Sequence, residues 1–212
     1  MNDQDGSLLH KMSDGGNLEN SGMIALLQRG ARKIVWFAAA YQPVDRSINL
    51  CKANTGNDEL VRAGVVYEVL DKFGFALELP HLNELNDVAH NQIFERSSIH
   101  DVMCQLQQSF DSGTPPVVFF NGTVMKNTWW GLPGGLEVEV ALVYLERSET
   151  FIGLLPPDTQ HEIHKGARGK FADYPNYPTT GGDGTNEQYN LLAATVEYYV
   201  RENKQRFFDL LG

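Results

Sequence analysis

Cysteine is scarce in this sequence, which has only two cysteines among its 212 residues, Cys51 and Cys104. Two cysteines cannot build the dense disulfide framework of a small secreted domain. Two thiols also cannot complete a zinc site without further ligands. We therefore expect both cysteines to be reduced, structural residues of a cytosolic protein.

Long hydrophobic runs are also missing. The longest, residues 34–41, is far shorter than the ~20 residues that cross a bilayer. Residues 1–6 are polar and acidic, without the positive and apolar regions of a signal peptide. These patterns predict a cytoplasmic protein with no transmembrane segment, in which any contact with membranes is peripheral.

Positive charge is in short supply, with 17 Lys and Arg against 27 Asp and Glu and a net charge of -10. A nucleic-acid binder normally carries a basic patch or stripe, so this balance argues against nucleic acid as a partner. It also disfavours simple electrostatic capture by anionic membranes. The basic residues in 29–33 and 201–206 have acidic neighbours and are typical of solvated helix ends.

The beginning of the chain has the most readable pattern of elements. It predicts a strand over 7–12, a turn over 13–17, a helix that starts at Asn20 or Ser21, and a strand over 34–39. The last of these is a continuous apolar run, as in strands that are buried on both faces. Strand, turn, helix and buried strand together form a βαβ unit.

The rest of the chain continues this alternation, which predicts an α/β fold with a mostly parallel sheet flanked by helices. We expect one domain over 1–212, itself an incomplete part of a larger catalytic domain. Its further predicted elements are helices over 59–72 and 99–109, a buried strand over 117–120, a more exposed strand over 138–142, a long loop over 154–185 and a C-terminal helix from about Asn186.

The candidate site is the turn Asp14-Gly15-Gly16. In the predicted βαβ unit Asp14 follows the carboxyl end of the first strand, where open α/β sheets collect catalytic groups. Two glycines allow a tight backbone approach, so that the carboxylate can face a cleft and act as a general base on a serine hydroxyl. The alternative is an ordinary turn in which Asp14 only accepts hydrogen bonds from backbone amides.

Several segments together resemble the catalytic domain of patatin-like and cytosolic phospholipase A2-like acyl hydrolases. They are Asp14-Gly15-Gly16, Glu19-Asn20, Gln28-Arg29-Gly30 and Lys33, followed later by Trp129-Trp130-Gly131, Gly134-Gly135 and residues 174–179. The resemblance implies a Ser–Asp dyad with Asp14 as the aspartate, a phospholipid or lysophospholipid ester as substrate, and no cofactor. It favours the phospholipase A2 and lysophospholipase branch, because a long stretch of chain follows the aspartate.

The sequence departs from this family in one decisive respect: it contains no Gly-x-Ser-x-Gly nucleophile motif. Without the serine the covalent step cannot occur, so whether these residues alone form an enzyme stays open. One hypothesis is the C-terminal portion of a lipid acyl hydrolase whose serine lies in sequence absent here. A second is an inactive, truncated relative that binds lipid or another protein. A third is an unrelated α/β domain in which Asp14 only shapes a turn.

Other motifs predict no chemistry. His161 and His164 lack the spacing and the third ligand of a zinc site, and we read them as a polar surface stretch. His100 is expected to have an ordinary structural role, and no metal is predicted. Trp129-Trp130 is interpreted as core or lid packing, with an exposed apolar patch for lipid as the alternative.

Overall fold

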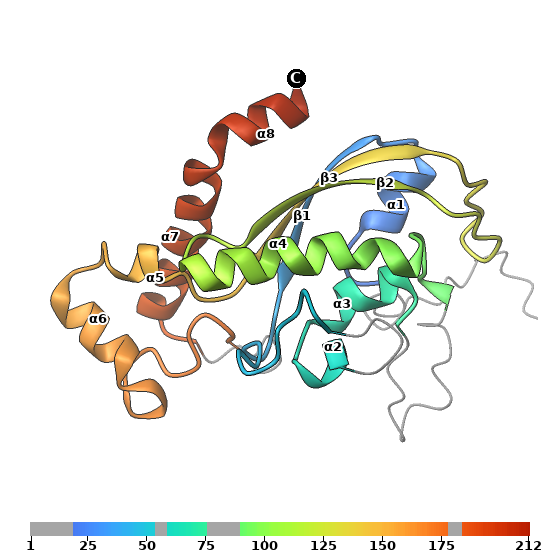
Figure 1. Cartoon of the computed structure of the whole chain (residues 1–212). Coiled ribbons are helices and arrows are strands. Elements are labelled where there is room, and N and C mark those ends of the chain that lie inside the picture. Colours follow the sequence, from blue (N-terminus) through green and yellow to red (C-terminus); the bar gives the residue numbers. More distant parts are fainter. Residues whose placement is uncertain (1–18, 54–58, 76–89, 178–183) are drawn as a thin grey trace, which may run out of the picture.

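A computed structural model describes residues 19–53, 59–75, 90–177 and 184–212 of the chain. Within these ranges the fold is α/β, with a three-stranded sheet flanked by helices (Figure 1). The strands are β1 (Lys33–Ala39), β2 (Val117–Thr123) and β3 (Glu137–Leu145), in the order β1-β3-β2. β1 is parallel to β3 and β2 is antiparallel to it, so the described sheet is mixed. The α/β class is confirmed, whereas a mostly parallel sheet stays a prediction.

The burial of the strands differs from the sequence-based expectation. β3 is the central strand and its residues 140–144 are all buried, whereas the pattern predicted an exposed strand. The alternation set by Glu137 and Glu139 covers only the beginning of the strand. β1 was expected to be buried on both faces, but its burial alternates and Phe37 is 54% exposed. An outer strand with one solvated face can carry apolar residues on that face.

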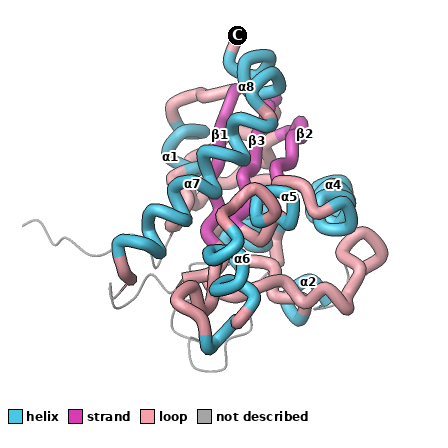
Figure 2. Tube along the Cα trace, turned by 90° about the vertical axis from the view of Figure 1, so that its left-hand side faces the viewer, coloured by secondary structure: helices cyan, strands magenta, loops and turns pink. Residues whose placement is uncertain are grey.

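One face of the sheet packs against α4 (Ile99–Ser112) and the short helices α1 (Met23–Gln28), α2 (Glu59–Arg62) and α3 (Tyr67–Leu70). The other face is covered by α7 (Asn186–Glu202) and α8 (Lys204–Leu211), whose Tyr199, Phe207 and Leu210 contact the sheet. Figure 2 shows α4 and α7 on opposite sides of the strands. The sheet is therefore the middle layer of three.

The predicted helix over 99–109 is confirmed and extends to Ser112, where Gly113 ends it in a left-handed conformation. The predicted helix over 59–72 is broken into α2, α3 and the 3-10 turn η2 (Asp71–Phe73). Gly64 lies at the break with a φ of +79°, next to the Pro43 carbonyl oxygen. A second 3-10 turn, η4 (Arg96–Ser98), leads into α4.

The predicted loop over 154–185 is not entirely irregular. It contains α6 (Pro157–His164) and the 3-10 turn η5 (Gly166–Arg168), and α5 (Glu149–Ile152) precedes it. In α6 only Ile163 is buried, so the helix has no apolar periodicity by which the sequence could reveal it. Its real signals are a proline in the first turn and histidines in the last.

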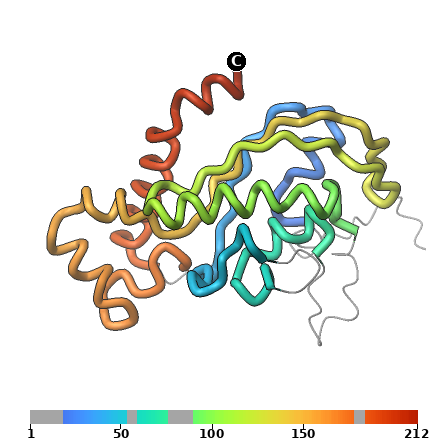
Figure 3. The backbone as a smooth tube through the Cα atoms, in the orientation of Figure 1, coloured from blue at the N-terminus to red at the C-terminus, as the bar shows by residue number. Residues whose placement is uncertain are grey.

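The C-terminal helix starts at Asn186, as predicted. Thr185 and Gln188 form a reciprocal capping box at its N-terminus. After Asn203 the chain continues as α8, which Figure 3 shows rising away from the end of α7. Across the described ranges no helix combines the length and the apolar character that crossing a bilayer would require.

Among the described residues, a side chain of α4 and not another strand pairs with the outer edge of β2 at Phe119. The Gln105 side-chain amide donates from Nε2 to the Phe119 carbonyl oxygen at 3.1 Å. Its Oε1 accepts from the Phe119 backbone N–H at 3.3 Å. One glutamine of α4 thus pairs with both main-chain groups of a strand residue, as a neighbouring strand would.

Candidate functional site

The predicted catalytic aspartate, Asp14, and the glycines that support it, Gly15 and Gly16, lie outside the described residues. So does the predicted strand over 7–12. The described chain begins at Glu19, five residues after Asp14 in the sequence. Glu19 is the described residue nearest to Asp14 in the sequence.

Glu19 takes part in a buried cluster of charges. The Lys72 ammonium is 3.3 Å from Glu19 Oε1, 3.0 Å from Asp71 Oδ1 and 3.2 Å from Asp71 Oδ2. The side chains of Lys72 and Glu19 are 1% and 9% exposed, and Asp71 is 4% exposed. One cation thus holds two carboxylates that come from distant parts of the chain. Ions this far from water require such pairing.

Neutral side chains extend the cluster toward the tryptophan pair. The Asn91 amide donates to Asp71 Oδ2 at 3.1 Å, and Trp130 Nε1 donates to Asn91 Oδ1 at 3.0 Å. Trp130 is therefore a packed, hydrogen-bonded residue, in line with the first interpretation of the pair. Trp129 is 56% exposed and stacks on the His90 ring with a centroid distance of 4.3 Å. Lipid contact through Trp129 stays a prediction.

The environment of Asp71 shifts its protonation. Burial raises the pKa of the Asp71 carboxyl to about 6, against the attraction of Lys72 and the hydrogen bonds from Lys72 and Asn91. Glu19 adds a smaller contribution in the same direction as burial, because the two carboxylates repel each other. Asp71 is therefore able to gain and lose a proton within about a pH unit or two of neutrality.

Glu19 also fixes the start of α1. The Ser21 backbone N–H donates to Glu19 Oε1 at 2.9 Å, and the Ser21 hydroxyl donates to the same oxygen. Ser21 Oγ in turn accepts from the Met23 N–H at 3.2 Å. The N-cap residue of the helix is Gly22, one residue after Ser21 and two after Asn20, the two predicted starting points. The segment that follows Asp14-Gly15-Gly16 is thus held at a buried ion.

The sequence interpretation missed this cluster. Lys72 was expected at the end of a helix, because lysine is rarely buried and is assigned to the surface by default. One signal was available: Asp71 and Lys72 interrupt a strongly apolar stretch, residues 69–75. An adjacent acid and base within such a stretch indicates a buried pair.

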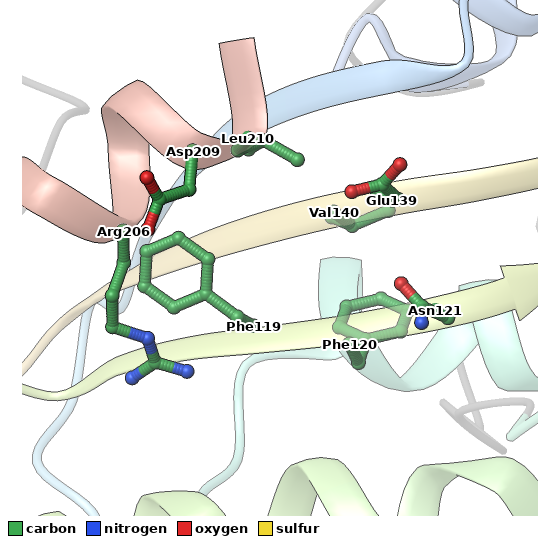
Figure 4. Close-up of a pocket in the computed structure, with 8 residues that line it drawn as sticks. All are labelled: Phe119, Phe120, Asn121, Glu139, Val140, Arg206, Asp209 and Leu210. Atoms are coloured by element: carbon green, nitrogen blue, oxygen red, sulfur yellow. The ribbon is translucent and has the colours of Figure 1, made fainter. Parts of the chain in front are cut away.

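A surface hollow of about 360 Å³ lies on the other face of the sheet, between the sheet and α8 (Figure 4). At the rim of the hollow, the Arg206 guanidinium lies 4.0 Å from the centre of the Phe119 ring. The eight residues that line it are Phe119, Phe120, Asn121, Glu139, Val140, Arg206, Asp209 and Leu210. They include no serine, cysteine, histidine or lysine, so the hollow supplies no nucleophile of its own.

The two cysteines contradict the expectation that they are reduced: Cys51 and Cys104 form a disulfide. They are 53 residues apart, and the loop that carries Cys51 folds back onto α4, a contact that sequence spacing does not reveal. His100 lies beside them, and these three residues form the one group of potential metal ligands within the described parts of the chain. His161 and His164 are exposed on α6, as predicted.

The described residues therefore contain a buried charge cluster that includes Glu19, and a separate group formed by His100 and Cys104 of α4 with Cys51. Comparison with known proteins adds no further identification: no protein-family model, curated protein or solved structure matches this chain.

Proposed function

We propose that this chain is the C-terminal portion of a phospholipase A2- or lysophospholipase-like lipid acyl hydrolase, with Asp14 as the base of a Ser–Asp dyad. The serine would come from sequence outside these 212 residues. In the complete catalytic domain the parallel pair of β1 and β3 would belong to a mostly parallel sheet. The observation that carries the proposal is the buried Lys72–Glu19 ion pair, which anchors Glu19, three residues after Gly16 in the sequence.

The chemistry follows from the pairing of a hydroxyl with a carboxylate. As the serine oxygen attacks the ester carbonyl, Asp14 accepts the hydroxyl proton and then returns it to the departing alcohol. Water hydrolyses the acyl-enzyme by the same route in the second half of the reaction. A carboxylate can perform these transfers only when it is held within hydrogen-bond distance of the hydroxyl.

To hold the Asp14 carboxylate within hydrogen-bond distance of the serine, the protein has to anchor the residues that follow Asp14. Glu19 is tied to Lys72 and to Ser21, and α1 is fixed to the core by the buried side chains of Met23, Ile24 and Leu27. We propose that anchoring Glu19 restricts the positions that Asp14, five residues earlier in the sequence, can take in the complete enzyme. In this proposal Lys72 and Glu19 are positioning residues and do not touch the substrate.

The second candidate is an inactive relative that binds lipid or another protein. It is favoured by the missing Gly-x-Ser-x-Gly motif and by the exposed indole of Trp129. Aromatic side chains of this kind contribute to membrane-interface contacts. The two candidates differ in one measurable property, the presence of an activated serine.

The test uses the full translated product of the gene and a fluorophosphonate probe, which labels activated serines. We expect labelling of a serine upstream of Asp14, and we expect Asp14→Asn to lower kcat on a lysophospholipid by roughly 10²- to 10⁴-fold. Asp158→Asn, on the exposed first turn of α6, is the matched control and should retain activity.

Two results would count against the enzyme. A full product that the probe fails to label, or an Asp14→Asn variant that turns over at the normal rate, would refute the dyad. If the unlabelled product still cosediments with phosphatidylcholine vesicles, and Trp129→Ala abolishes that binding, the second candidate is supported instead.

A further inference from the structure

His100 and Cys104 are one helical turn apart on α4, so their side chains share a face of the helix. The Cys104 sulfur is 3.7 Å from His100 Nε2 and 3.8 Å from His100 Nδ1. The Cys51 sulfur completes the group, and one ligand atom from each of the three residues lies within 4.8 Å of the others. This cluster is separate from the Glu19–Lys72 site, and nothing in the proposed hydrolase function uses it.

These distances match the needs of a tetrahedral ion. With Zn–S bonds of about 2.3 Å and Zn–N bonds of about 2.05 Å, a nitrogen and a sulfur on one zinc ion are about 3.6 Å apart. The distance between His100 and Cys104 is already close to that value. Two sulfurs on the same ion are about 3.8 Å apart, so the bond between the cysteines has to open. The His100 ring, whose two nitrogens are nearly equidistant from the Cys104 sulfur, also has to turn until one of them faces the ion.

The loop that carries Cys51 is held on α4 by contacts that do not involve sulfur. The Leu50 side chain is 1% exposed, and the Leu50 backbone N–H donates to Gln107 Oε1 at 2.8 Å. Earlier in the same loop, the Arg46 guanidinium lies 3.6 Å above the centre of the Phe110 ring. Gln107 and Phe110 both belong to α4. Reduction of the disulfide therefore leaves Cys51 beside Cys104.

We propose that Cys51, Cys104 and His100 form a redox-controlled site for a thiophilic divalent cation of the Zn²⁺ class. A dithiol reductant exchanges with the disulfide, so that the reductant becomes a disulfide and the protein gains two thiols. The ion then binds two thiolates and one neutral imidazole, and the two thiol protons are released. In the reverse exchange a disulfide oxidant accepts two electrons and becomes a dithiol, the Cys51–Cys104 bond re-forms, and the ion loses both thiolates and is released.

The surroundings suit this chemistry. The exposed carboxylate of Asp101 lies 3.6 Å from His100 Nδ1, and a carboxylate near a ligating histidine favours metal binding. Both cysteines are also on the wall of a surface hollow of about 510 Å³ with polar neighbours such as Asn49 and Gln107. Solvent therefore reaches both cysteines, and a water molecule would be the fourth ligand. Thiolate ligands select Zn²⁺ over Mg²⁺ and Ca²⁺.

The experiment titrates Zn²⁺ into the 212-residue chain in competition with a chromophoric chelator, after reduction with a phosphine under argon and without reduction. We expect one ion per chain in the reduced form and none in the oxidised form. Co²⁺ should give thiolate-to-metal charge-transfer bands and the visible bands of a tetrahedral site. His100→Ala should weaken Zn²⁺ binding by about tenfold or more, since it removes one of three ligands.

His164→Ala, an exposed histidine on α6, is the matched control and should leave Zn²⁺ affinity unchanged. Circular dichroism of the reduced wild-type chain checks that its helices persist; their loss would overturn the inference, which requires a loop held without the disulfide. Reduced protein that binds Zn²⁺ no better than the Cys51→Ser/Cys104→Ser double variant would also overturn it. So would a His100→Ala variant with wild-type affinity.

Discussion

Replacing Lys72 with methionine tests the buried charge cluster most directly. Methionine keeps most of the length of the lysine stem and removes the ammonium, which is 3.0–3.3 Å from oxygens of Asp71 and Glu19. At an effective dielectric constant of about 20, each ion pair at this separation has a gross attraction of about 5 kcal/mol. Removal of one partner from a buried pair costs a net 3–5 kcal/mol, because the remaining charge stays desolvated.

The loss should depend on pH in a defined way. With a pKa of about 6, Asp71 is largely ionised at pH 7 and largely protonated at pH 5. Lys72 lowers the pKa of Asp71, so its removal raises that pKa further, and at pH 5 the Asp71 carboxyl is protonated in both proteins. We therefore expect a smaller destabilisation at pH 5 than at pH 7.

Equilibrium urea unfolding at both pH values measures these quantities. The free energy of unfolding of a small protein falls by about 2 kcal/mol per molar urea, so the urea midpoint of Lys72→Met at pH 7 should be about 1.5–2.5 M below that of the wild type. Lys165→Met is the control, because the Lys165 side chain is 40% exposed and its partner Glu162 keeps the hydrogen bond from the Lys170 N–H, so the midpoint should barely move. A Lys72→Met protein as stable as the wild type at pH 7, or one with equal losses at both pH values, would show that the cluster is not desolvated as described.

Three further substitutions test separate parts of the fold. The pKa of Asp71 is about 6 in the folded state and 3.8 in the unfolded state, so the folded state loses stability as pH rises between these values. The free energy of unfolding of the wild type should therefore fall by about 3 kcal/mol relative to that of Asp71→Asn over this pH range. Urea midpoints from pH 4 to 7 measure the difference, and parallel curves for the two proteins would refute it. Thr185→Ala removes the cap of α7 and should cost about 1 kcal/mol, seen as a Tm lowered by about 2–4 °C in calorimetry. Tyr144→Phe removes the hydroxyl that accepts a hydrogen bond from the buried Val66 N–H at 2.9 Å. The free energy of unfolding should fall by about 1–3 kcal/mol in the same urea assay. An unchanged midpoint would mean that another acceptor replaces the hydroxyl.

Local periodicity identified the elements whose burial follows their own sequence. α4 was predictable because Val102, Met103 and Leu106 repeat at helical spacing and all three are buried. α6 was not, because Ile163 is its one buried residue. β3 was misjudged for a related reason: its two glutamates dominate the pattern, while its burial is decided by helices that pack on both faces from elsewhere in the chain.

The candidate sites depend on contacts between distant residues, which one-dimensional patterns do not contain. Glu19 and Lys72 meet across a large sequence separation, and so do Cys51 and Cys104. Each residue alone has a common default interpretation: a surface lysine, a helix-capping segment, a reduced thiol. The fold overrides these defaults by bringing complementary groups together.

The Gln105 amide at the edge of β2 bears on how copies of this protein behave at high concentration. An outer strand with free main-chain groups is a template on which another chain can add a strand, and repeated addition leads to aggregation. At Phe119 both of those groups are already engaged by a side chain fixed on α4. A foreign strand would have to displace the glutamine before it could bond there, so the middle of this edge is protected against sheet growth without a proline, a lysine or a bulge.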